Sequence, residues 1–297
     1  MANMDRLAKF RKKVAHEETP ASPTVDVHPE SENNTSAEMN ADDQAVETSR
    51  LRPAGWSSPT YDQSRKVKLV PEIMSANRCI AFADKPEVVD AYKVLRTQIL
   101  QKMQFLGGNT LMVTSALPGD GKTTTAINLA FTMAKEFQQT VLLVDCDLQQ
   151  QDVHKQMGYK SDRGLIDYIL DDCPVSELFT WPSIEKISVV SGGRLIRESS
   201  ELLGSPRMKE LVSDMKLRYP DRFVIFDMQS ISAGADALVF AQLVDHIIMV
   251  VQEGKTPVSE IKRCVEMLPE GKLLGMMLNR HKIDTRPIKN PKTYVYQ

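Results

Sequence analysis

The chain has 297 residues, of which 42% are hydrophobic and 26% are charged, and its 37 basic side chains nearly balance 39 acidic ones. These values are typical of a globular protein without a general attraction to nucleic acid, and no stretch reaches the roughly 18 apolar residues that a membrane-spanning helix needs. Since no signal-peptide pattern is visible near the start either, we expect a cytosolic protein. The four cysteines are scattered and form no C-x-x-C pair, which fits reduced thiols and argues against a zinc site or a disulfide framework.

The start of the chain differs in composition from the rest. Residues 1–16 carry five Lys or Arg side chains against one acid, and Leu7, Phe10 and Val14 fall at helical spacing. We predict a short basic amphipathic helix here that docks on a membrane surface or a partner protein, with a solvated chain end as the alternative. Residues 17–64 hold ten acids and two arginines among many Pro, Ser, Thr and Asn residues, so we predict a disordered acidic linker.

From about residue 65 onward, short apolar segments alternate with amphipathic ones. In chain order, the sequence predicts helix 86–106, strand 110–114, helix 122–136, strand 140–145, helix 165–170, strand 187–190, helix 206–217, strand 223–227, helix 235–243, strand 246–251, helix 258–268 and strand 273–278. This alternation is typical of a parallel sheet with helices on both faces. We predict one doubly wound α/β domain over residues 65–285, with a mostly parallel sheet, and a flexible tyrosine-bearing tail over residues 286–297.

The turn after the first predicted strand carries the most specific motif. Residues 116–123 read Ala-Leu-Pro-Gly-Asp-Gly-Lys-Thr and match the P-loop pattern, except that alanine replaces the first glycine. The glycines allow backbone N–H groups to surround phosphate oxygens, the lysine reaches the outer phosphates, and the threonine hydroxyl binds Mg²⁺. We therefore expect a nucleotide site formed by Pro118, Gly119, Asp120, Gly121, Lys122, Thr123 and Thr124.

Two further strands end in aspartates. Four apolar residues lead to Asp145 and Asp147, and another four lead to Asp227. Because parallel strands deliver their carboxyl ends to one edge of a sheet, these carboxylates can converge beside the P-loop and bind Mg²⁺ together with Thr123. The alternative for each aspartate taken alone is a cap on the next element.

The loop, the aspartate pair and the second aspartate strand together resemble the deviant-Walker P-loop ATPases, a group that contains cell-division-site ATPases, chromosome-partitioning ATPases and the bacterial tyrosine kinases. Finer matches favour the bacterial tyrosine kinases, and they comprise residues 115–130, 145–154, 201–208, 236–237, 250–251, 254–256 and 278–280. The lysine that the partitioning ATPases carry early in the loop is absent here. The resemblance covers about residues 85–282.

The resemblance implies a cytosolic tyrosine autokinase that uses ATP and Mg²⁺. It further implies a homo-oligomeric ring and a separate membrane chain-length regulator for exopolysaccharide export, which holds the kinase at the inner face of the membrane. By the same resemblance, Lys122 and Thr123 bind phosphates and magnesium, while Asp145 and Asp147 serve magnesium and activate the acceptor hydroxyl. Asp227 would position magnesium through water.

The resemblance extends to residues outside the phosphate site. Asn279 and Arg280 would lie near the adenine. The helix residues Asp90, Lys93 and Arg96 are similar to the ring-forming Glu-x-x-Arg-x-x-Arg motif of the family, whereas on spacing alone they describe an ordinary solvated helix face.

Three stretches depart from the family pattern. Gln149 and Gln150 stand where the family usually has basic residues, residues 227–230 lack the usual prolines, and the C-terminal tyrosine cluster is reduced to Tyr294 and Tyr296. We expect these two tyrosines to be the phosphoacceptors, with an inert tail as the alternative.

The shortened cluster also keeps a second function open. In this alternative, the protein is an ATPase switch that recruits a membrane partner according to its bound nucleotide and phosphorylates nothing. A third alternative, a positioning ATPase that acts with nucleic acid, is disfavoured by the near-neutral charge and by the missing lysine, so we expect no nucleic-acid partner.

Overall fold

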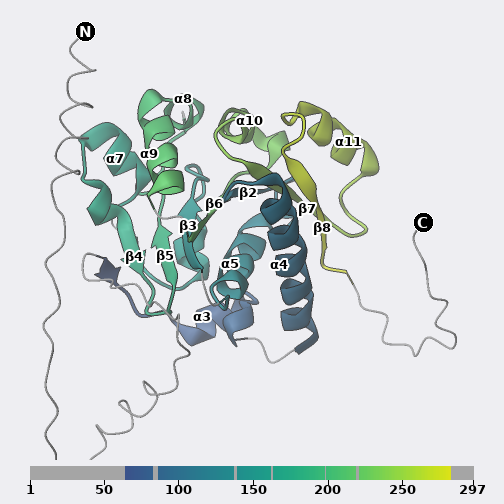
Figure 1. The fold of residues 1–297 in the computed structure, drawn as a ribbon, viewed down its shortest axis with the longest axis horizontal. Helices are drawn as coiled ribbons and strands as arrows, with labels where there is room; N and C mark the ends of the chain where they lie inside the picture. Colours follow the sequence, from purple (N-terminus) through teal and green to yellow (C-terminus); the bar gives the residue numbers. More distant parts are fainter. Residues whose placement is uncertain are drawn as a thin grey trace, which may run out of the picture. The chain divides into compact units, whose positions relative to one another are not determined.

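The computed structural model describes residues 64–82, 86–136, 139–161, 163–197, 199–218 and 221–281 (Figure 1). All of them belong to one compact unit. The predicted basic helix of residues 1–16, the linker over residues 17–64 except for its last residue, and the tail over residues 286–297 lie outside the described residues and stay predictions. The described elements run from Arg65 to Asn279, within the predicted domain.

An eight-stranded sheet forms the centre, in the order β1-β4-β5-β3-β6-β2-β7-β8. The strands are β1 (Arg65–Lys66), β2 (Thr110–Ser115), β3 (Thr140–Asp145), β4 (Phe179–Trp181), β5 (Ile187–Val190), β6 (Arg222–Asp227), β7 (His246–Gln252) and β8 (Leu273–Asn279). Every neighbouring pair is parallel except β4 with β5. The predicted doubly wound, mostly parallel sheet is confirmed. The sequence analysis did not predict β1 and β4, because two or three residues are too few to show a strand pattern.

Helices connect the strands. They are α3 (Pro71–Ala76), α4 (Pro86–Leu106), α5 (Lys122–Met133), α6 (Val153–Gln156), α7 (Leu165–Asp171), α8 (Ser199–Leu203), α9 (Pro206–Leu217), α10 (Asp236–Ala241) and α11 (Val258–Met267). The six predicted helices are all present, and α4 has the predicted bounds. The predictions missed α3, α6 and α8, each of which has six residues or fewer.

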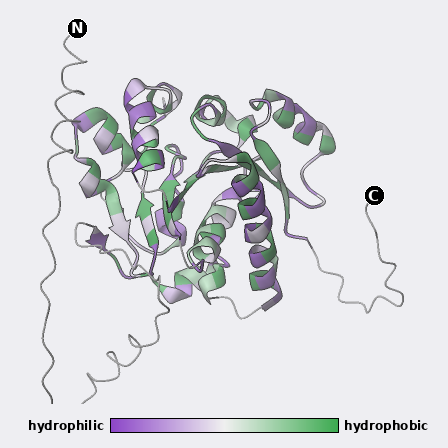
Figure 2. Cartoon of the chain, viewed as in Figure 1, coloured by the Kyte–Doolittle hydropathy of each residue, from purple (hydrophilic) through white to green (hydrophobic). Residues whose placement is uncertain are grey.

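The helices cover both faces of the sheet, with α4 and α5 on one face and α7 to α10 on the other (Figure 1). Successive strand side chains point to opposite faces, so Leu111 and Val113 pack with α4 and α5 while Met112 packs with α9 and α10. Figure 2 shows the central strands as hydrophobic and α4 as a mixture of hydrophobic and hydrophilic residues. The two buried clusters fix the sheet between the helices, and the loops at its edges are left to carry polar residues.

Three strands bring the predicted site residues to one edge. β6 lies between β3 and β2, and Asp227 at its end pairs in register with Asp145 on one side and with Val113 on the other. The P-loop begins at Ala116, three residues after Val113 and directly after the end of β2. The structure therefore places both aspartate-bearing strand ends next to the phosphate loop, as parallel strands require.

Candidate functional site

The phosphate loop joins β2 to α5. Gly119 and Gly121 have φ angles of 85° and 102°, in the left-handed region that glycine adopts at little cost. A Cβ on Gly121 would lie 2.1 Å from Nδ2 of Asn279, so a side chain here would displace the Asn279 amide from its hydrogen bond to the Asp120 carbonyl. The chain then enters α5 at Lys122, and the free N–H groups of the first turn and the positive end of the helix dipole make this loop suited to phosphate.

Asp120 has a different role from its neighbours in the loop. Its side chain is buried, and its carboxylate accepts hydrogen bonds from the Leu117 N–H (2.9 Å) and the Thr256 hydroxyl (2.8 Å). Its carbonyl oxygen accepts a third hydrogen bond from Nδ2 of Asn279 (2.7 Å). Of the residues predicted to bind nucleotide, Asp120 thus directs its side chain to the protein itself.

Lys122 and Asp147 form an ion pair at the start of α5. Nζ of Lys122 lies 2.9 Å from Oδ2 of Asp147, and both side chains are almost fully buried. Burial alone would lower the pKa of Lys122, but the negative charges of Asp227, Asp147 and Asp145 outweigh it and raise that pKa. The lysine is therefore held as a cation among three carboxylates that converge from two strands.

Asp145 is fully buried, and its two oxygens accept backbone hydrogen bonds. Oδ1 accepts from the Asp147 N–H at 3.2 Å and Oδ2 from the Val153 N–H at 3.1 Å. Burial, and next the charge of Asp227, raise its pKa well above the usual range of an aspartate. The contacts show how Asp145 fixes the loop that carries Asp147.

Asp227 is also fully buried, but neither of its carboxylate oxygens has a hydrogen-bond partner within the residues that the structure describes. Burial raises its pKa to about 7, against the positive charge of Lys122 and the Thr123 hydroxyl, which lies nearby without meeting hydrogen-bond geometry. Unpartnered buried carboxylates are costly, and they are common where a cation or water completes the site.

The donor set fits Mg²⁺ shared with a nucleotide better than a metal held by protein alone. No group of three or more His, Cys, Asp or Glu side chains in the described part of the chain is arranged to hold a metal. Mg²⁺ typically uses one or two carboxylates together with phosphate oxygens and waters. The Thr123 hydroxyl, Asp147 and the unpartnered Asp227 provide that smaller set beside the phosphate loop.

The end of β8 forms the next part of the site. Asn279 contacts the phosphate loop, as described above, and its Oδ1 accepts a hydrogen bond from the Arg280 N–H at 2.8 Å. Nη1 of Arg280 donates to Oε1 of Gln252 at 3.1 Å. The structure thus brings the two residues predicted near the adenine to the side of the phosphate loop, together with the loop that follows β7.

The structure adds a polar cluster that sequence reasoning missed. Nε2 of Gln149 donates to the Ser199 hydroxyl at 3.1 Å, and the Ser199 hydroxyl donates to the Asp236 carboxylate. Burial raises the pKa of Asp236, and the charge of nearby Asp147 adds to this. Gln149 and Asp236 stood in segments that the sequence analysis had singled out, but nothing in the sequence pointed to Ser199.

The three residues of the predicted ring motif do not share one environment. Lys93 pairs with Asp90 at 2.8 Å on the exposed face of α4. Arg96 instead binds the end of α5, through the Thr132 carbonyl (3.1 Å) and the Glu136 carboxylate (2.9 Å). The predicted acceptors Tyr294 and Tyr296 lie outside the described residues.

The chain is similar in sequence to known nucleotide-binding proteins and protein kinases. Residues 111–290 match the family described as CobQ/CobB/MinD/ParA nucleotide binding domain. The tyrosine-protein kinase YwqD of Bacillus subtilis is 32% identical over 196 residues, which is 65% of this chain and 81% of YwqD. The succinoglycan biosynthesis transport protein ExoP of Rhizobium meliloti is 25% identical over 215 residues, which is 69% of this chain but 26% of ExoP.

A solved structure extends the likeness to three dimensions. The kinase domain of the Escherichia coli tyrosine kinase ETK aligns with a TM-score of 0.62 at 26% identity, over 72% of this chain and 83% of that domain. The family match spans more than half of the present chain, and YwqD is matched over most of its length. The chain therefore belongs to the CobQ/CobB/MinD/ParA nucleotide-binding family and, within it, to the bacterial tyrosine kinases.

Proposed function

We propose that the protein is an ATP-dependent protein-tyrosine autokinase that regulates exopolysaccharide chain length and export by phosphorylating C-terminal tyrosines of a neighbouring subunit. The phosphoryl-transfer part of the proposal rests on the buried carboxylate of Asp227, which has no hydrogen-bond partner among the described residues and lies close enough to Lys122 for their charges to shift each other's pKa. The similarity to the tyrosine-protein kinase YwqD favours a kinase. A parallel-sheet edge that joins a phosphate loop to such a carboxylate is suited to magnesium-dependent phosphoryl transfer.

Each site residue has a defined task in this proposal. The N–H groups of residues 119–124 and Nζ of Lys122 bind the phosphates, and Thr123, Asp147 and Asp227 hold Mg²⁺. When bound, Mg²⁺ neutralises the charge of the phosphate oxygens. Because Nζ of Lys122 has three N–H donors, it can contact the phosphates while it stays paired with Asp147.

The acceptor needs a base, since a tyrosine hydroxyl has a pKa near 10. Asp147 is better placed for this than Asp145, because both oxygens of Asp145 accept backbone N–H groups, whereas in Asp147 only Oδ1 does, from Gln150, and Oδ2 faces Lys122. In this proposal, Asp145 positions Asp147. Asn279 and Arg280 lie near the adenine of the nucleotide. Tyr294 and Tyr296 are the proposed acceptors.

A separate membrane protein, a chain-length regulator, is the proposed partner, and it would hold the kinase at the cytoplasmic face of the membrane. The name of ExoP, which links that relative to the transport of a polysaccharide, supports the proposed role in polysaccharide export. Within the part of the chain that the structure describes, no helix has the length and apolar character to cross a bilayer. A homo-oligomeric ring, with Asp90 and Lys93 exposed on α4, is part of the same proposal.

The second candidate function is an ATPase switch that recruits the membrane partner without phosphorylating it or itself. The reduction of the tyrosine cluster to two residues favours it. Both functions use the same phosphate-site residues, so only the fate of the phosphate separates them.

Mass spectrometry of the purified protein with Mg-ATP tests the proposal. The parent is compared with Lys122→Met and with the double variant Tyr294→Phe, Tyr296→Phe. We expect phosphate on the tail of the parent and on neither variant. Hydrolysis of ATP with every tyrosine unmodified, even with the membrane partner present, would establish the switch instead.

A further inference from the structure

The loop after β7 is joined to the phosphate loop by one side chain. Thr256 lies in this loop, and its hydroxyl accepts a hydrogen bond from the Gln252 N–H at 3.0 Å. The same hydroxyl donates to Oδ1 of Asp120 at 2.8 Å. Because a hydroxyl has one proton to donate, the contact with Gln252 leaves that proton directed at Asp120.

Asp120 connects the Thr256 hydroxyl to the backbone of the phosphate loop. Its other carboxylate oxygen, Oδ2, accepts from the Leu117 N–H at 2.9 Å, so one buried carboxylate joins Thr256 to the start of the loop. Hydrogen bonds to an ionised group are stronger than those between neutral groups, so the arrangement resists distortion.

The glycines on either side make the loop dependent on this contact. Gly119 and Gly121 flank Asp120, and both occupy the left-handed region, where glycine is free to move between several conformations. The peptide groups that would face the phosphates are therefore not fixed by their own backbone preferences. The contacts of Asp120, including the Asn279 hydrogen bond to its carbonyl, fix them instead.

We propose that Thr256 is a positioning residue for the nucleotide phosphates, which acts through Asp120 to hold the N–H groups of the phosphate loop in their binding orientation. The proposal rests on the proposed nucleotide-dependent function. It assigns Thr256 no contact with the nucleotide. Since Gln252, which orients the hydroxyl, also binds Arg280, the same chain of contacts joins the phosphate side of the site to the end of β8.

Affinity for Mg-ADP, measured by titration with a fluorescent ADP analogue, tests the proposal on the full chain. Thr256→Val keeps the shape of the side chain and removes the hydroxyl, and we expect it to weaken binding by about ten-fold. Thr256→Ser keeps the hydroxyl and is expected to bind within about two-fold of the parent. Thr97→Val is the matched control, because the Thr97 hydroxyl donates to the Lys93 carbonyl on the exposed face of α4.

A double variant separates action through Asp120 from a direct effect. Asp120→Ala removes the acceptor of both the Thr256 hydroxyl and the Leu117 N–H, so it should weaken binding at least as much as Thr256→Val does. The double variant should bind no more weakly than Asp120→Ala alone, since Thr256→Val then has no contact left to break. Losses that add would overturn the proposal. So would parent-like affinity in Thr256→Val, or equal losses in Thr256→Val and Thr256→Ser.

The thermal unfolding midpoint distinguishes positioning from stability. We expect Thr256→Val to unfold within a few degrees of Thr97→Val, and a large drop shared by Thr256→Val and Thr256→Ser would assign Thr256 a structural role only. Failure of the kinase proposal can be told apart from failure of this one. If the parent binds Mg-ADP but never phosphorylates tyrosine, the kinase proposal fails, while the affinities of the variants for Mg-ADP relative to the parent still test the role of Thr256.

Discussion

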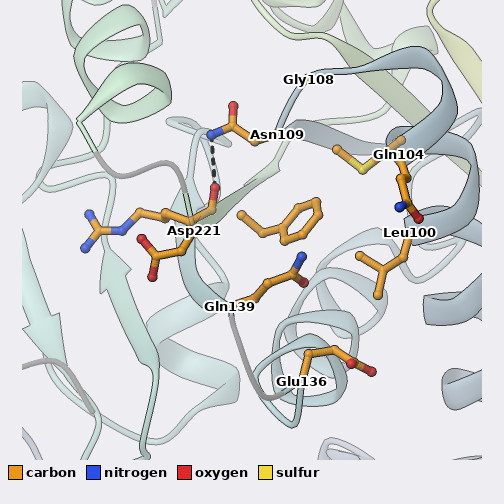
Figure 3. Close-up of a pocket in the computed structure, with 10 residues that line it drawn as sticks. Leu100, Gln104, Gly108, Asn109, Glu136, Gln139 and Asp221 are labelled. Atoms are coloured by element: carbon orange, nitrogen blue, oxygen red, sulfur yellow. Dashed lines mark hydrogen bonds between the residues drawn. The ribbon is translucent and has the colours of Figure 1, made fainter. Parts of the chain in front are cut away.

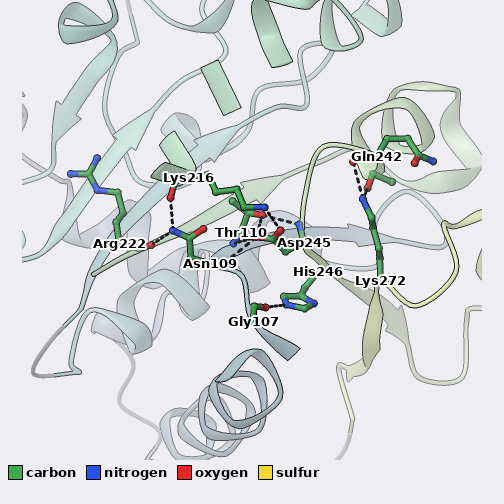
Figure 4. A network of polar contacts seen from close by, with 10 residues as sticks. Gly107, Asn109, Thr110, Lys216, Arg222, Gln242, Asp245, His246 and Lys272 are labelled. Carbon is green, nitrogen blue, oxygen red and sulfur yellow. Dashed lines mark hydrogen bonds and ion pairs between the residues drawn. The ribbon is translucent and has the colours of Figure 1, made fainter. Parts of the chain in front are cut away.

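An aspartate lies at each end of the strands: Asp245 at the amino edge, where the strands begin, and Asp227 at the carboxyl edge, where they end. Asp245 is partly buried and Asp227 is fully buried, and their surroundings shift their pKa values in opposite directions. At the amino edge, Asp245 precedes β7, and its Oδ2 accepts from the Asn109 N–H, the Thr110 N–H and the Thr110 hydroxyl at 2.8 to 3.2 Å (Figure 4). Its Oδ1 pairs with Lys216. Although burial alone would raise the pKa of Asp245, these contacts lower it.

At the carboxyl edge, Asp227 has no such donors among the described residues, and burial raises its pKa to about 7. A carboxylate surrounded by donors stabilises the fold as it stands, whereas one without donors destabilises it until a cation or water arrives. The contrast indicates that Asp245 is structural and that Asp227 is retained for binding.

The size of a cavity does not distinguish the structural edge from the binding edge. A cavity of about 530 Å³ lies at the amino edge, lined among others by Asn109, Glu136, Gln139 and Asp221 (Figure 3). It lies among the starts of the strands, away from the phosphate loop at their ends. The pattern of partnered and unpartnered charges, not the volume, marks the phosphate edge as the site.

The largest expected effect is on phosphoryl transfer. Asp227→Asn should lower tyrosine phosphorylation roughly a hundred-fold, because the amide cannot provide the charge that holds Mg²⁺ and its waters. Asp245→Asn should leave the rate per folded molecule unchanged. The measurement is incorporation of radiolabelled phosphate at saturating Mg-ATP, and equal losses in the two variants would remove the functional distinction between the edges.

Stability should respond in the reverse order. Asp245→Asn breaks the ion pair with Lys216 and is expected to lower the free energy of unfolding by about 2 kcal/mol, below the value for a fully buried pair because Lys216 is 35% exposed. Asp227→Asn should be neutral or stabilising, since it removes a buried charge without partners. Urea unfolding at pH 8 measures both, and a loss in Asp227→Asn as large as that in Asp245→Asn would contradict the comparison.

The pH dependence of stability should also differ between Asp227 and Asp245. Asp227 has a folded-state pKa of about 7 against an ordinary 3.8, so the folded protein binds the proton more tightly and its stability falls as the pH rises from about 4 to 7. The lowered pKa of Asp245 stabilises the fold above about pH 4, and this is lost at lower pH. Relative to the parent, Asp227→Asn should therefore gain stability, by up to a few kcal/mol, between pH 4 and pH 7. A constant difference across that range would show that Asp227 is not the titrating group.

The residues at the carboxyl edge were largely predictable from sequence, because each lies in a short sequence pattern that can be recognised by itself. The phosphate loop is a contiguous motif, and the convergence of Asp145, Asp147 and Asp227 follows from the rule that parallel strands end at one edge. The mostly parallel sheet was equally accessible, since each predicted strand carries its own apolar run.

The contacts that orient these residues were not predictable. Thr256 and Asp120 are 136 positions apart, and Ser199 and Gln149 are 50 apart, so no local pattern joins them. Asp120 fits the loop pattern equally well whether its side chain faces the nucleotide or the protein. Arg96 has helical spacing from Lys93, yet it binds the end of α5, which only packing decides.

The smallest expected effect compares one glycine from each edge. Gly119 in the phosphate loop and Gly107 before β2 have φ angles of 85° and 80°, and a Cβ on either would meet nothing within 4 Å. Replacing either by alanine should therefore lower the free energy of unfolding by the same amount, about 1 kcal/mol, through backbone strain alone.

Only one of the two glycine variants should affect nucleotide. In Gly119→Ala the strain acts on the peptide groups that face the phosphates, so affinity for Mg-ADP should fall a few-fold, while Gly107→Ala should bind as the parent does. Urea unfolding and nucleotide titration of the same two preparations provide both numbers. If Gly107→Ala also weakened binding, strain at the amino edge would be transmitted through β2 to the phosphate loop. The two edges could then not be treated as independent.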